Sequence, residues 1–482
     1  MSVINVSQVT EAVARLCIDA NYFINPDIKA SYEASLARET NDMARKVTEI
    51  LIENADIAIA NEVPLCQDTG LAVVFIDIGQ DVRLEGGDIT QAINAGVAKG
   101  YTEGYLRKSV VGDPINRKNT GDNTPAVIHY NIVPGDYIEI HVAPKGFGSE
   151  NMSAVKMLKP SDGLEGVEKF VIDTVFHSGS NPCPPLILGI GVGGTMEQCA
   201  KLAKQALLRD LSIPNPDPSW AAVEANLLAK INELGIGPSG FGGELTAMAV
   251  HIEAYPTHIA GLPVALNFGC HATRHAMAVL REDTPIEYHT PRPDALPEAP
   301  EFVQGGEEGR RLSTPFSQED IDSLKAGEMV LISGHIYTAR DAAHKRMVEM
   351  LERGEDLPIE TQGQVVYYAG PSPTKPGDVI GSVGPTTSGR MDKYSPVLMS
   401  KGLKLMIGKG MRDEPVRQAI THTRGAYLTA IGGAAAYMAR CVKEVELVAF
   451  EDLGTEAIRR LTVVDFPAIV AIDPTGNAIE NA

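Results

Sequence analysis

The sequence predicts a mixed α/β (α+β) protein with two folded parts, and three observations support this prediction. Helical and strand-like patterns alternate along the chain, which at 482 residues is too long for one ordinary hydrophobic core. Prolines crowd into an acidic stretch near residue 290, where neither a helix nor a central strand can continue. Strand and helix patterns then resume, so we expect a linker followed by a second, smaller α/β domain.

The first part begins with helices and continues with strands. Apolar residues at helical spacing predict helices between residues 6 and 59. Short apolar runs at 71–78 and 137–143, bounded by Gly, Asn and Pro, predict strands. Strong helical patterns follow at 196–211 and 220–234, which makes this part a mixture of helices and strands.

The second part shows the same mixture of patterns. A strand is expected at 330–337, a helix at 341–354 and another strand at 365–370. A run of small residues predicts a long helix around 423–442. The expected boundaries are 1–282 for the first domain, 283–312 for the linker and 313–482 for the second domain.

The charge of the chain limits its partners. It carries 42 basic and 62 acidic side chains, a formal charge of −20, which repels nucleic acid and anionic lipid. An acidic small molecule would therefore need a local cluster of Arg and Lys. No stretch approaches the ~20 apolar residues that cross a bilayer, and the N-terminus is unlike a secretory signal or an Arg-rich transit peptide. We expect a cytoplasmic protein that binds neither nucleic acid nor membrane.

The six cysteines fall into two groups by their setting. Three lie on apolar faces of predicted helices, where a free cysteine packs as a small hydrophobe: Cys17, Cys199 and Cys441. The others lie in loops rich in Pro, Gly or Asn: Cys66 in PLCQDTG, Cys183 in NPCPP and Cys270 in NFGCHATRH. Disulfides are not expected in a cytosolic chain, so the second group suits either a shared metal site or ordinary loop packing.

Three thiolates have a specific chemical meaning in an iron–sulfur protein. A four-iron cluster held by three cysteines leaves one iron without a protein ligand, and that iron can act as a Lewis acid towards substrate and water. A fourth cysteine would favour electron transfer instead. The three cysteines are too widely spaced to form a local motif, so their spacing alone is weak support.

Several polar loops could hold an anion. Their Arg and Lys residues suit carboxylates, and their glycines leave backbone N–H groups free. Arg340 should sit at the end of a strand, where α/β domains place ligand contacts. Each such residue alone is typical of a surface, but together they favour a site. The loops are RKSVVGDPINRKNTGDN (107–123), KGFGSENMS (145–153), RDAAH (340–344), GPTTSGRMD (384–392) and GKG (408–410).

A glycine-rich segment, GIGVGGT (189–195), precedes the helix expected at 196 and superficially suggests a dinucleotide loop. Its spacing is GxGxGG instead of GxGxxG, and the strand LIL (186–188) before it is short. We therefore interpret it as a helix N-terminus or a substrate-anion contact, with an NAD-dependent dehydrogenase as the weaker alternative.

Together these segments resemble the class I fumarases, iron–sulfur hydro-lyases related to L-tartrate dehydratase, nearly end to end. PLCQDTG, RKSVVGDP, NTGDNTPA, PKGFGSENMS, NPCPP, GIGVGGT and GLPVALNFGCHATRH are similar to the family's larger part, and GHIYTARDAAHKR, YYAGPSP, GPTTSGRMD and IGKG to its smaller part. In some members these parts are separate α and β subunits, which the linker would fuse here. The resemblance implies a larger N-terminal domain that carries the cluster, a smaller swivelling β/α domain that closes over it, and a homodimer.

Carried over by motif, the resemblance implies roles for individual residues. Cys66, Cys183 and Cys270 resemble the ligands of a [4Fe–4S] cluster, and Asp68, His258 and Thr386 resemble the catalytic residues. Contacts with a dicarboxylate substrate are implied for Gln67, Arg107, Gly148, Arg340, Arg390 and Lys409.

The implied catalytic residues divide the proton transfers between them. Thr386 would exchange the proton at C3, and its motif leaves open whether Thr386 or Thr387 faces the substrate. Threonine is a poor base unless its oxygen is stabilised, so this role depends on neighbouring Arg and backbone donors. Asp68 and His258 would handle the proton of the added water.

The implied reaction is the reversible hydration of fumarate to (S)-malate. The nearest alternative keeps the mechanism but changes the substrate to tartrate or mesaconate, because the motifs would hardly differ. Fusion of both parts in one chain modestly favours fumarase. An alternative of another class is an iron–sulfur protein of electron transfer or regulation.

Overall fold

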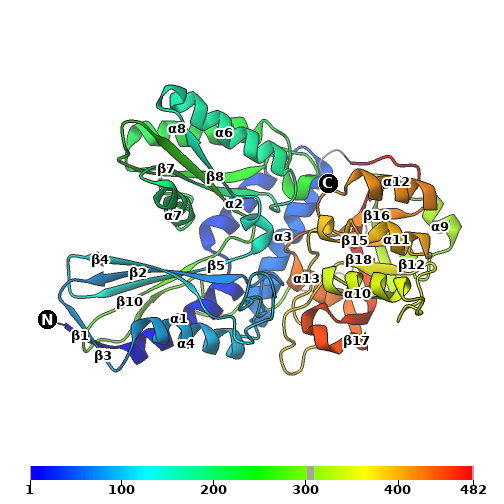
Figure 1. The fold of residues 1–482 in the computed structure, drawn as a ribbon, viewed down its shortest axis with the longest axis horizontal. Helices are drawn as coiled ribbons and strands as arrows, with labels where there is room; N and C mark the ends of the chain where they lie inside the picture. Colours follow the sequence, from blue (N-terminus) through cyan, green and yellow to red (C-terminus); the bar gives the residue numbers. More distant parts are fainter. Residues whose placement is uncertain (1, 301–308, 480–482) are drawn as a thin grey trace.

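The computed structural model describes residues 2–300 and 309–479. Within them the chain forms two parts that lie side by side, an N-terminal part with three β-sheets and a C-terminal part with one (Figure 1). The mixed α/β class predicted from the sequence is confirmed. No helix in these two ranges is long and apolar enough to span a membrane.

The first large sheet of the N-terminal part has the strand order β11-β10-β5-β2-β4. Alternate residues of its middle strands, such as Val74 opposite Val142, point into a core that helices α1 and α4 close. The strands predicted at 71–78 and 137–143 are β2 and β5. The elements of this sheet and of the small parallel pair β1-β3 are β1 (Ser2–Asn5), β2 (Leu71–Gly79), β3 (Val82–Glu85), β4 (Val127–Val133), β5 (Ile138–Lys145), β10 (Ala276–Leu280), β11 (Glu287–His289), α1 (Val6–Tyr22) and α4 (Ile89–Glu103).

The second large sheet has the order β6-β9-β7-β8, with α6 and α8 on one face and α7 on the other. Its strand β7 runs through most of the glycine-rich segment, which is therefore a buried strand that leads into α7. A Cβ at Gly189 or Gly191 would lie 2.0 or 1.9 Å from the carbonyl oxygen of Ala203 or Cys199. These glycines thus let α7 pack directly on β7, a role that was not predicted. The elements are β6 (Ala154–Leu158), β7 (Leu186–Gly193), β8 (Ala247–Tyr255), β9 (Leu262–Gly269), α5 (Phe147–Glu150), α6 (Gly163–Ser178), α7 (Met196–Ala206), α8 (Pro218–Asn232), η1 (Pro160–Asp162) and η2 (Pro238–Gly240).

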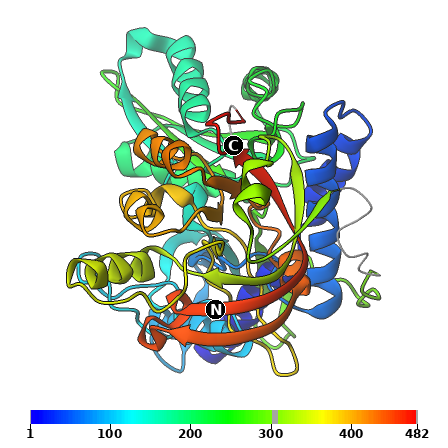
Figure 2. The ribbon, with the colours of Figure 1, turned by 90° about the vertical axis from the view of Figure 1, so that its right-hand side faces the viewer.

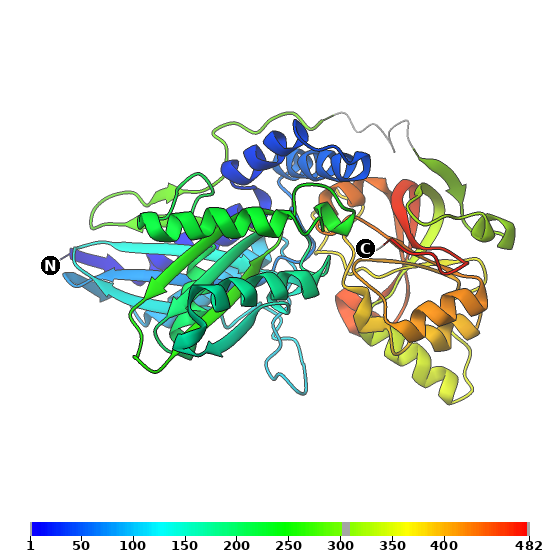
Figure 3. The ribbon, with the colours of Figure 1, turned by 90° about the horizontal axis from the view of Figure 1, so that it is seen from above.

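Helices α2 (Pro26–Leu36) and α3 (Asp42–Asn61) lie at the junction of the two parts (Figures 1 and 3). α3 packs against α13 (Ala435–Cys441) of the C-terminal part. Ile50 of α3 and Met438 of α13 belong to one hydrophobic core, which continues into the C-terminal sheet. The two parts therefore share apolar packing.

The C-terminal sheet has the strand order β12-β13-β14-β15-β16-β18-β17. Strands β12 to β16 run parallel, so their carboxyl ends lie on one edge. The long strand β18 pairs with both β16 and β13 and so closes the sheet on itself (Figure 2, red). The elements are β12 (Arg310–Ser313), β13 (Met329–Thr338), β14 (Val365–Tyr367), β15 (Leu405–Gly408), β16 (Ala426–Thr429), β17 (Val442–Ala449), β18 (Ile458–Ile472), α9 (Gln318–Asp322), α10 (Asp341–Glu352), α11 (Ser395–Ser400), α12 (Glu414–Thr423), η3 (Ser388–Met391) and η4 (Glu451–Glu456).

The prediction of one long helix around 423–442 is wrong. Residues 426–429 form β16 in the middle of the sheet, and the helix α13 begins at Ala435. Gly433 separates the two with φ +80°, a backbone conformation that cannot continue a right-handed helix. The small residues here form a loop at the carboxyl end of β16.

The proline-rich stretch joins the two parts. It contributes β11 to the edge of the first N-terminal sheet, and β12 begins the C-terminal sheet. Residues 301–308, which fall within the linker expected at 283–312, lie outside the described residues.

Candidate active site

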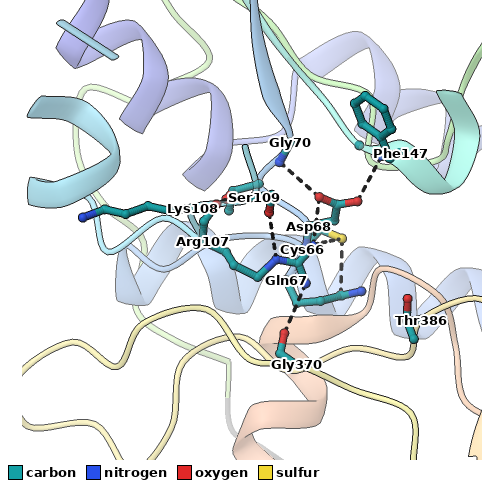
Figure 4. A network of polar contacts seen from close by, with 12 residues as sticks. Cys66, Gln67, Asp68, Gly70, Arg107, Lys108, Ser109, Phe147, Gly370 and Thr386 are labelled. Atoms are coloured by element: carbon teal, nitrogen blue, oxygen red, sulfur yellow. Dashed lines mark hydrogen bonds and ion pairs between the residues drawn. The ribbon is translucent and has the colours of Figure 1, made fainter. Parts of the chain in front are cut away.

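The turn at 66–68, before β2, lies where the N-terminal part meets the C-terminal part (Figure 4). The Asp68 carboxylate accepts hydrogen bonds from the N–H groups of Gly70 at 3.2 Å and Phe147 at 3.0 Å. It also forms an ion pair with Arg107, with Oδ1 and Nη2 3.0 Å apart. Burial by itself would raise the pKa of Asp68, but Arg107 and the Phe147 N–H outweigh it and hold the pKa below its ordinary value. The Asp68 carboxylate is therefore ionised, and its three contacts fix its orientation.

Arg274 fastens this turn to the loop that follows β9. Its Nη2 donates to the carbonyl oxygen of Asp68 at 2.6 Å, its Nη1 to that of Ala272 at 2.7 Å, and its Nε to Asn21 Oδ1 at 3.1 Å. The residue is buried, so these charge-assisted bonds form in a nearly dry environment. No sequence feature marked Arg274 beyond its place in NFGCHATRH.

The loops that carry Cys183 and Cys270 are tied to each other. The His271 N–H donates to the carbonyl oxygen of Cys183 at 3.0 Å, and the Tyr32 hydroxyl donates to the carbonyl oxygen of His271. Cys183 has φ +62°, a left-handed conformation that is uncommon for a residue other than glycine. Such a conformation persists where the surrounding structure imposes it, and it clusters at functional sites.

Lys409 reaches the three loop cysteines from the C-terminal part. Its Nζ donates to Cys183 Sγ at 2.6 Å, and the thiols of Cys66 and Cys270 also act on it electrostatically. Burial would lower the pKa of Lys409, but these thiols raise it above its ordinary value. A Cβ at Gly148 would lie 3.1 Å from Lys409 Nζ, so the glycine loop borders the same group.

The surroundings of the three loop cysteines bear on their fit to an iron–sulfur cluster. All three thiols act on Lys409, so they face one region of the site. Burial raises the pKa of Cys66 to about 11 and also raises that of Cys183, whereas metal binding keeps a thiol deprotonated. Cys66 Sγ accepts a hydrogen bond from the Asp68 N–H at 3.4 Å, as a thiolate ligand would. The residues present therefore fit a cluster held by Cys66, Cys183 and Cys270.

The remaining three cysteines lie on the buried faces of helices, as predicted. Cys17, Cys199 and Cys441 are buried in α1, α7 and α13. Burial raises the pKa of Cys17 and of Cys441 to about 12, which keeps both thiols protonated.

The C-terminal part places cations at the carboxyl ends of its parallel strands. Arg340 follows β13 and Lys409 follows β15, so both lie at the same edge of the sheet. The prediction that Arg340 sits at a strand end is confirmed. Arg340 is 8% exposed, its Nη2 lies 3.1 Å from the Glu456 carboxylate, and its Nε has no hydrogen-bond partner among the described residues. Its nearest acidic neighbour is the Asp341 carboxylate, with Oδ1 3.8 Å from Nε, which is longer than a hydrogen bond.

Three arginines crowd together at this edge. Burial lowers the pKa of Arg390 and of Arg107. The positive charge of Arg340 lowers both pKa values further. Asp341 and Glu456 offset part of this charge; Asp341 Oδ1 lies 3.5 Å from Arg390 Nη1. Glu456 was not predicted, because it reaches the site from the segment between β17 and β18 and no local motif marks it.

The turn 384–392 carries Thr386 and Arg390. The Thr386 N–H donates to the carbonyl oxygen of Tyr368 at 2.7 Å, which fixes the turn beside the end of β14. Arg390 Nη2 donates to the Thr386 hydroxyl. A cationic donor of this kind stabilises negative charge on the oxygen that it contacts, and here that oxygen belongs to Thr386.

Contacts across the junction bring the two sets of residues together (Figure 4). Gln67 Nε2 donates to the carbonyl oxygen of Pro385 at 3.1 Å, and Arg107 Nη1 donates to that of Gly370 at 3.2 Å. Both side chains come from the N-terminal part, and both acceptors belong to C-terminal loops that border the cations.

His258 lies apart from the other predicted residues. It occupies the exposed turn between β8 and β9, where its Nδ1 accepts a hydrogen bond from the Ala260 N–H at 3.2 Å. Cys270 follows the opposite end of β9, a strand of eight residues, which spans roughly 25 Å. Within one copy of the chain, His258 is too distant to touch a substrate held by the other residues, and its role stays a prediction.

Family models match nearly the whole chain. One described as Fumarate hydratase (Fumerase) matches residues 10–279, and one described as Fumarase C-terminus matches residues 285–482. The chain belongs to the fumarate hydratase family. Its members are hydro-lyases, so the chain is an enzyme of this class.

Individual relatives of this fumarate hydratase family agree with the match. Fumarate hydratase 2 of Leishmania major is 31% identical over 503 residues, which cover 98% of this chain and 86% of that protein. The anaerobic class I fumarate hydratase of Escherichia coli is 32% identical over 482 residues, 95% of this chain and 87% of that protein. A Methanocaldococcus jannaschii protein provisionally named L(+)-tartrate dehydratase subunit alpha is 41% identical over 285 residues, 58% of this chain and 100% of that protein. The predicted resemblance to class I fumarases is confirmed.

Proposed function

We propose that this protein catalyses the reversible hydration of fumarate to (S)-malate with a [4Fe–4S] cluster bound by Cys66, Cys183 and Cys270. The observation that carries the proposal is the meeting of three thiols, two of them buried and one partly buried, with a cluster of arginines and a lysine at one junction. An electron-transfer protein would have no use for the cations, which makes that alternative the weaker one.

The cysteines and Lys409 would share the work of holding the cofactor. When bound, the cluster would supply a Lewis-acidic iron without a protein ligand. Lys409, which contacts Cys183 Sγ, would offset part of the negative charge of three thiolates. The Asp68 N–H would stabilise the Cys66 thiolate in the same way.

A dicarboxylate needs cationic partners in a chain whose formal charge is −20. Arg340 offers an Nε that makes no hydrogen bond among the described residues and lies 3.8 Å from Asp341 Oδ1, and Arg390 and Arg107 act on the same region. Guanidinium forks bind carboxylates in two-point contacts, which would fix the orientation of the substrate. We assign the substrate contacts to Gln67, Arg107, Gly148, Arg340, Arg390 and Lys409.

Two residues would move the protons of the reaction. Thr386 would give a proton to one alkene carbon while the oxygen of water bonds to the other, and Arg390 would stabilise the charge left on the Thr386 oxygen. Asp68, whose pKa lies below its ordinary value, would accept the proton that the water loses. The reverse transfers would dehydrate malate.

We also propose a homodimer, in which a partner could bring His258 to a substrate. Ile259, next to it, is 91% exposed, which suits a residue that a partner covers. Domains 1–282 and 313–482, joined by the linker at 283–312, remain our proposed division of the chain. The cytoplasmic location expected from the sequence stays a prediction.

L-Tartrate is the second candidate substrate. The relative provisionally named as a tartrate dehydratase subunit matches the first part of the chain at 41% identity, and this part carries the cysteines and Asp68. A hydroxyl or methyl substituent on the substrate would leave the carboxylate contacts unchanged, so mesaconate also fits the cations.

Purification under anaerobic conditions, followed by supply of iron and sulfide, tests the proposal. The protein should turn brown and interconvert fumarate and malate, with a higher kcat/KM for malate than for L-tartrate or methylmalate. A higher value for tartrate or methylmalate would reassign the substrate. A colourless preparation with full activity would overturn the cluster. A brown protein that converts none of these acids and cycles its redox state in air would favour electron transfer.

A further inference from the structure

Buried side chains join two loops of the C-terminal part beneath the candidate site. The loops are 384–392, which carries Thr386, and 408–412, which carries Lys409. Their backbones touch, because the Ser388 N–H donates to the carbonyl oxygen of Lys409 at 2.9 Å and the Lys409 N–H donates to that of Thr386 at 3.3 Å. Both loops are largely irregular, so side chains must contribute to their spacing.

Tyr427 of β16 bridges the two loops. Its hydroxyl donates to the carbonyl oxygen of Gly410 at 2.8 Å and lies 2.8 Å from Ser388 Oγ. Burial raises the pKa of Tyr427 well above its ordinary value, so the hydroxyl stays protonated and able to donate. One oxygen atom thus contacts the neighbour of Lys409 in one loop and a residue close to Thr386 in the other.

Arg412 reinforces this bridge. Its side chain is 0% exposed, and its Cζ lies 5.4 and 5.0 Å from the ring centroids of Tyr368 and Tyr427. Its Nε donates to Asp392 Oδ1 at 2.7 Å and its Nη2 donates to Ser395 Oγ at 2.7 Å. Asp392 ends the first loop and Arg412 ends the second, so the ion pair ties the two loop ends together.

A buried ion pair is weak evidence of stabilisation as such. Apolar residues of similar volume often stabilise a protein as well or better. The planar fork of an arginine and the hydroxyl of a tyrosine instead define directions and distances. Such definition matters most where two catalytic loops must keep a fixed separation, as at this place in the molecule.

We propose that Tyr427 and Arg412 are positioning residues that set the separation of Thr386 and Lys409. The inference rests on the proposed function, which assigns Thr386 to proton transfer and Lys409 to carboxylate binding. Tyr427 and Arg412 act through the loops, without contact with the substrate. A displacement of about 1 Å at a reacting group can lower turnover by roughly a hundredfold, so loosening the bridge should be measurable.

Tyr427→Phe tests the bridge, because it removes one oxygen atom and keeps the ring beside Arg412. We expect kcat for malate to fall roughly tenfold or more. KM should also rise, but by a smaller factor than kcat falls, because Arg390 and Lys409 lie in the two loops whereas Arg107 and Arg340 lie outside them. Hydrogen exchange at the amides of residues 384–392 should become faster, and the colour of the reconstituted protein should not change.

Tyr22→Phe is the matched control. The buried Tyr22 hydroxyl donates to the carbonyl oxygen of Gly104 at 2.8 Å in the N-terminal part, so the variant loses the same kind of hydrogen bond. It should keep wild-type kcat and wild-type exchange in 384–392. Arg412→Lys is the second test variant, because an ammonium can reach Asp392 but cannot reproduce the fork. It should fold and lose kcat as Tyr427→Phe does.

Two results would overturn the proposal. One is wild-type kcat together with wild-type exchange in Tyr427→Phe. The other is an equal fall in kcat in Tyr427→Phe and Tyr22→Phe, which would reflect general destabilisation. If the wild-type protein converts no dicarboxylate, the proposed function fails separately, and the exchange data still decide whether Tyr427 holds the loops.

Discussion

The N-terminal and C-terminal parts supply the same site in different ways. The N-terminal part provides thiols and a carboxylate from turns beside its strands, and buried side chains such as Arg274 fasten these turns by their backbone. The C-terminal part provides Arg340 and Lys409 directly at the ends of parallel strands. The proposed cofactor ligands thus come from one part, and most of the proposed substrate cations come from the other. We therefore expect that mutations can change the retention of the cofactor and the affinity for the substrate separately.

The largest expected effect lies in the N-terminal part. Cys183→Ser should remove the brown colour and lower turnover by roughly three orders of magnitude or more, because a cluster that loses one of its three ligands is not retained and the Lewis-acidic iron is lost with it. Absorbance of the reconstituted protein and malate turnover measure both. Cys199→Ser is the matched control, since Cys199 Sγ already contacts the carbonyl oxygen of Met196 at 3.2 Å and a hydroxyl can donate there. Cys199→Ser should lower the free energy of unfolding by about 1 kcal/mol at most. The brown colour and the turnover of malate should remain those of the wild type. Equal losses in the two variants would contradict our division of the cysteines.

A smaller effect should appear when the C-terminal part is changed. Arg340→Lys loses the fork beside Glu456, so KM for malate should rise by roughly tenfold to a hundredfold, the value of one or two hydrogen bonds to a charged group. Colour and iron content should remain those of the wild type. Arg353→Lys, whose exposed side chain pairs with Glu355 on the surface, should leave KM unchanged. Loss of iron in Arg340→Lys would show that the two contributions are not separable.

The smallest effect concerns stability in acid, and it can be compared between the two parts with one buried histidine chosen from each. Burial lowers the pKa of His251 and of His344 to about 4 from 6.5. Between about pH 6.5 and pH 4 these histidines are protonated in the unfolded chain but remain neutral in the folded chain. The free energy of unfolding therefore decreases as the pH falls through this range. Each histidine should lower the free energy of unfolding by on the order of 1 kcal/mol at pH 5.5. Denaturant unfolding at pH 7.5 and 5.5 should show a shallower pH dependence in His344→Gln and in His251→Gln. An unchanged slope in either variant would contradict the buried neutral state of that histidine.

Local patterns were sufficient to predict the elements that present the site. The short apolar run at 71–78 marks β2, and the strand followed by RDAAH correctly placed Arg340 at a strand end. The setting of Cys199 on an apolar helical face correctly indicated burial. In each of these cases the deciding interactions lie within one element and its flanking turns, so the sequence around the residue contains the information.

Interactions between distant segments were beyond such patterns. Glu456 contacts Arg340 from the connection before β18, and Arg274 binds the backbone of Asp68 although the two lie 206 residues apart in the sequence. No local periodicity predicts either contact. The small residues of the segment 423–442 favour a helix locally, but pairing with β15 and β18 makes their first part a strand. Tertiary pairing outweighs local propensity there.

The apolar core that runs from α3 into the C-terminal sheet makes the two parts mutually dependent. Cleavage in the proline-rich stretch followed by separation would leave two fragments, and each would expose the apolar surface that the other fragment covers in the intact chain. A chain that consisted of the first part alone would need a second polypeptide to shield this surface permanently. Covalent fusion keeps both halves at a high effective concentration, so assembly here becomes an intramolecular event that dilution does not reverse.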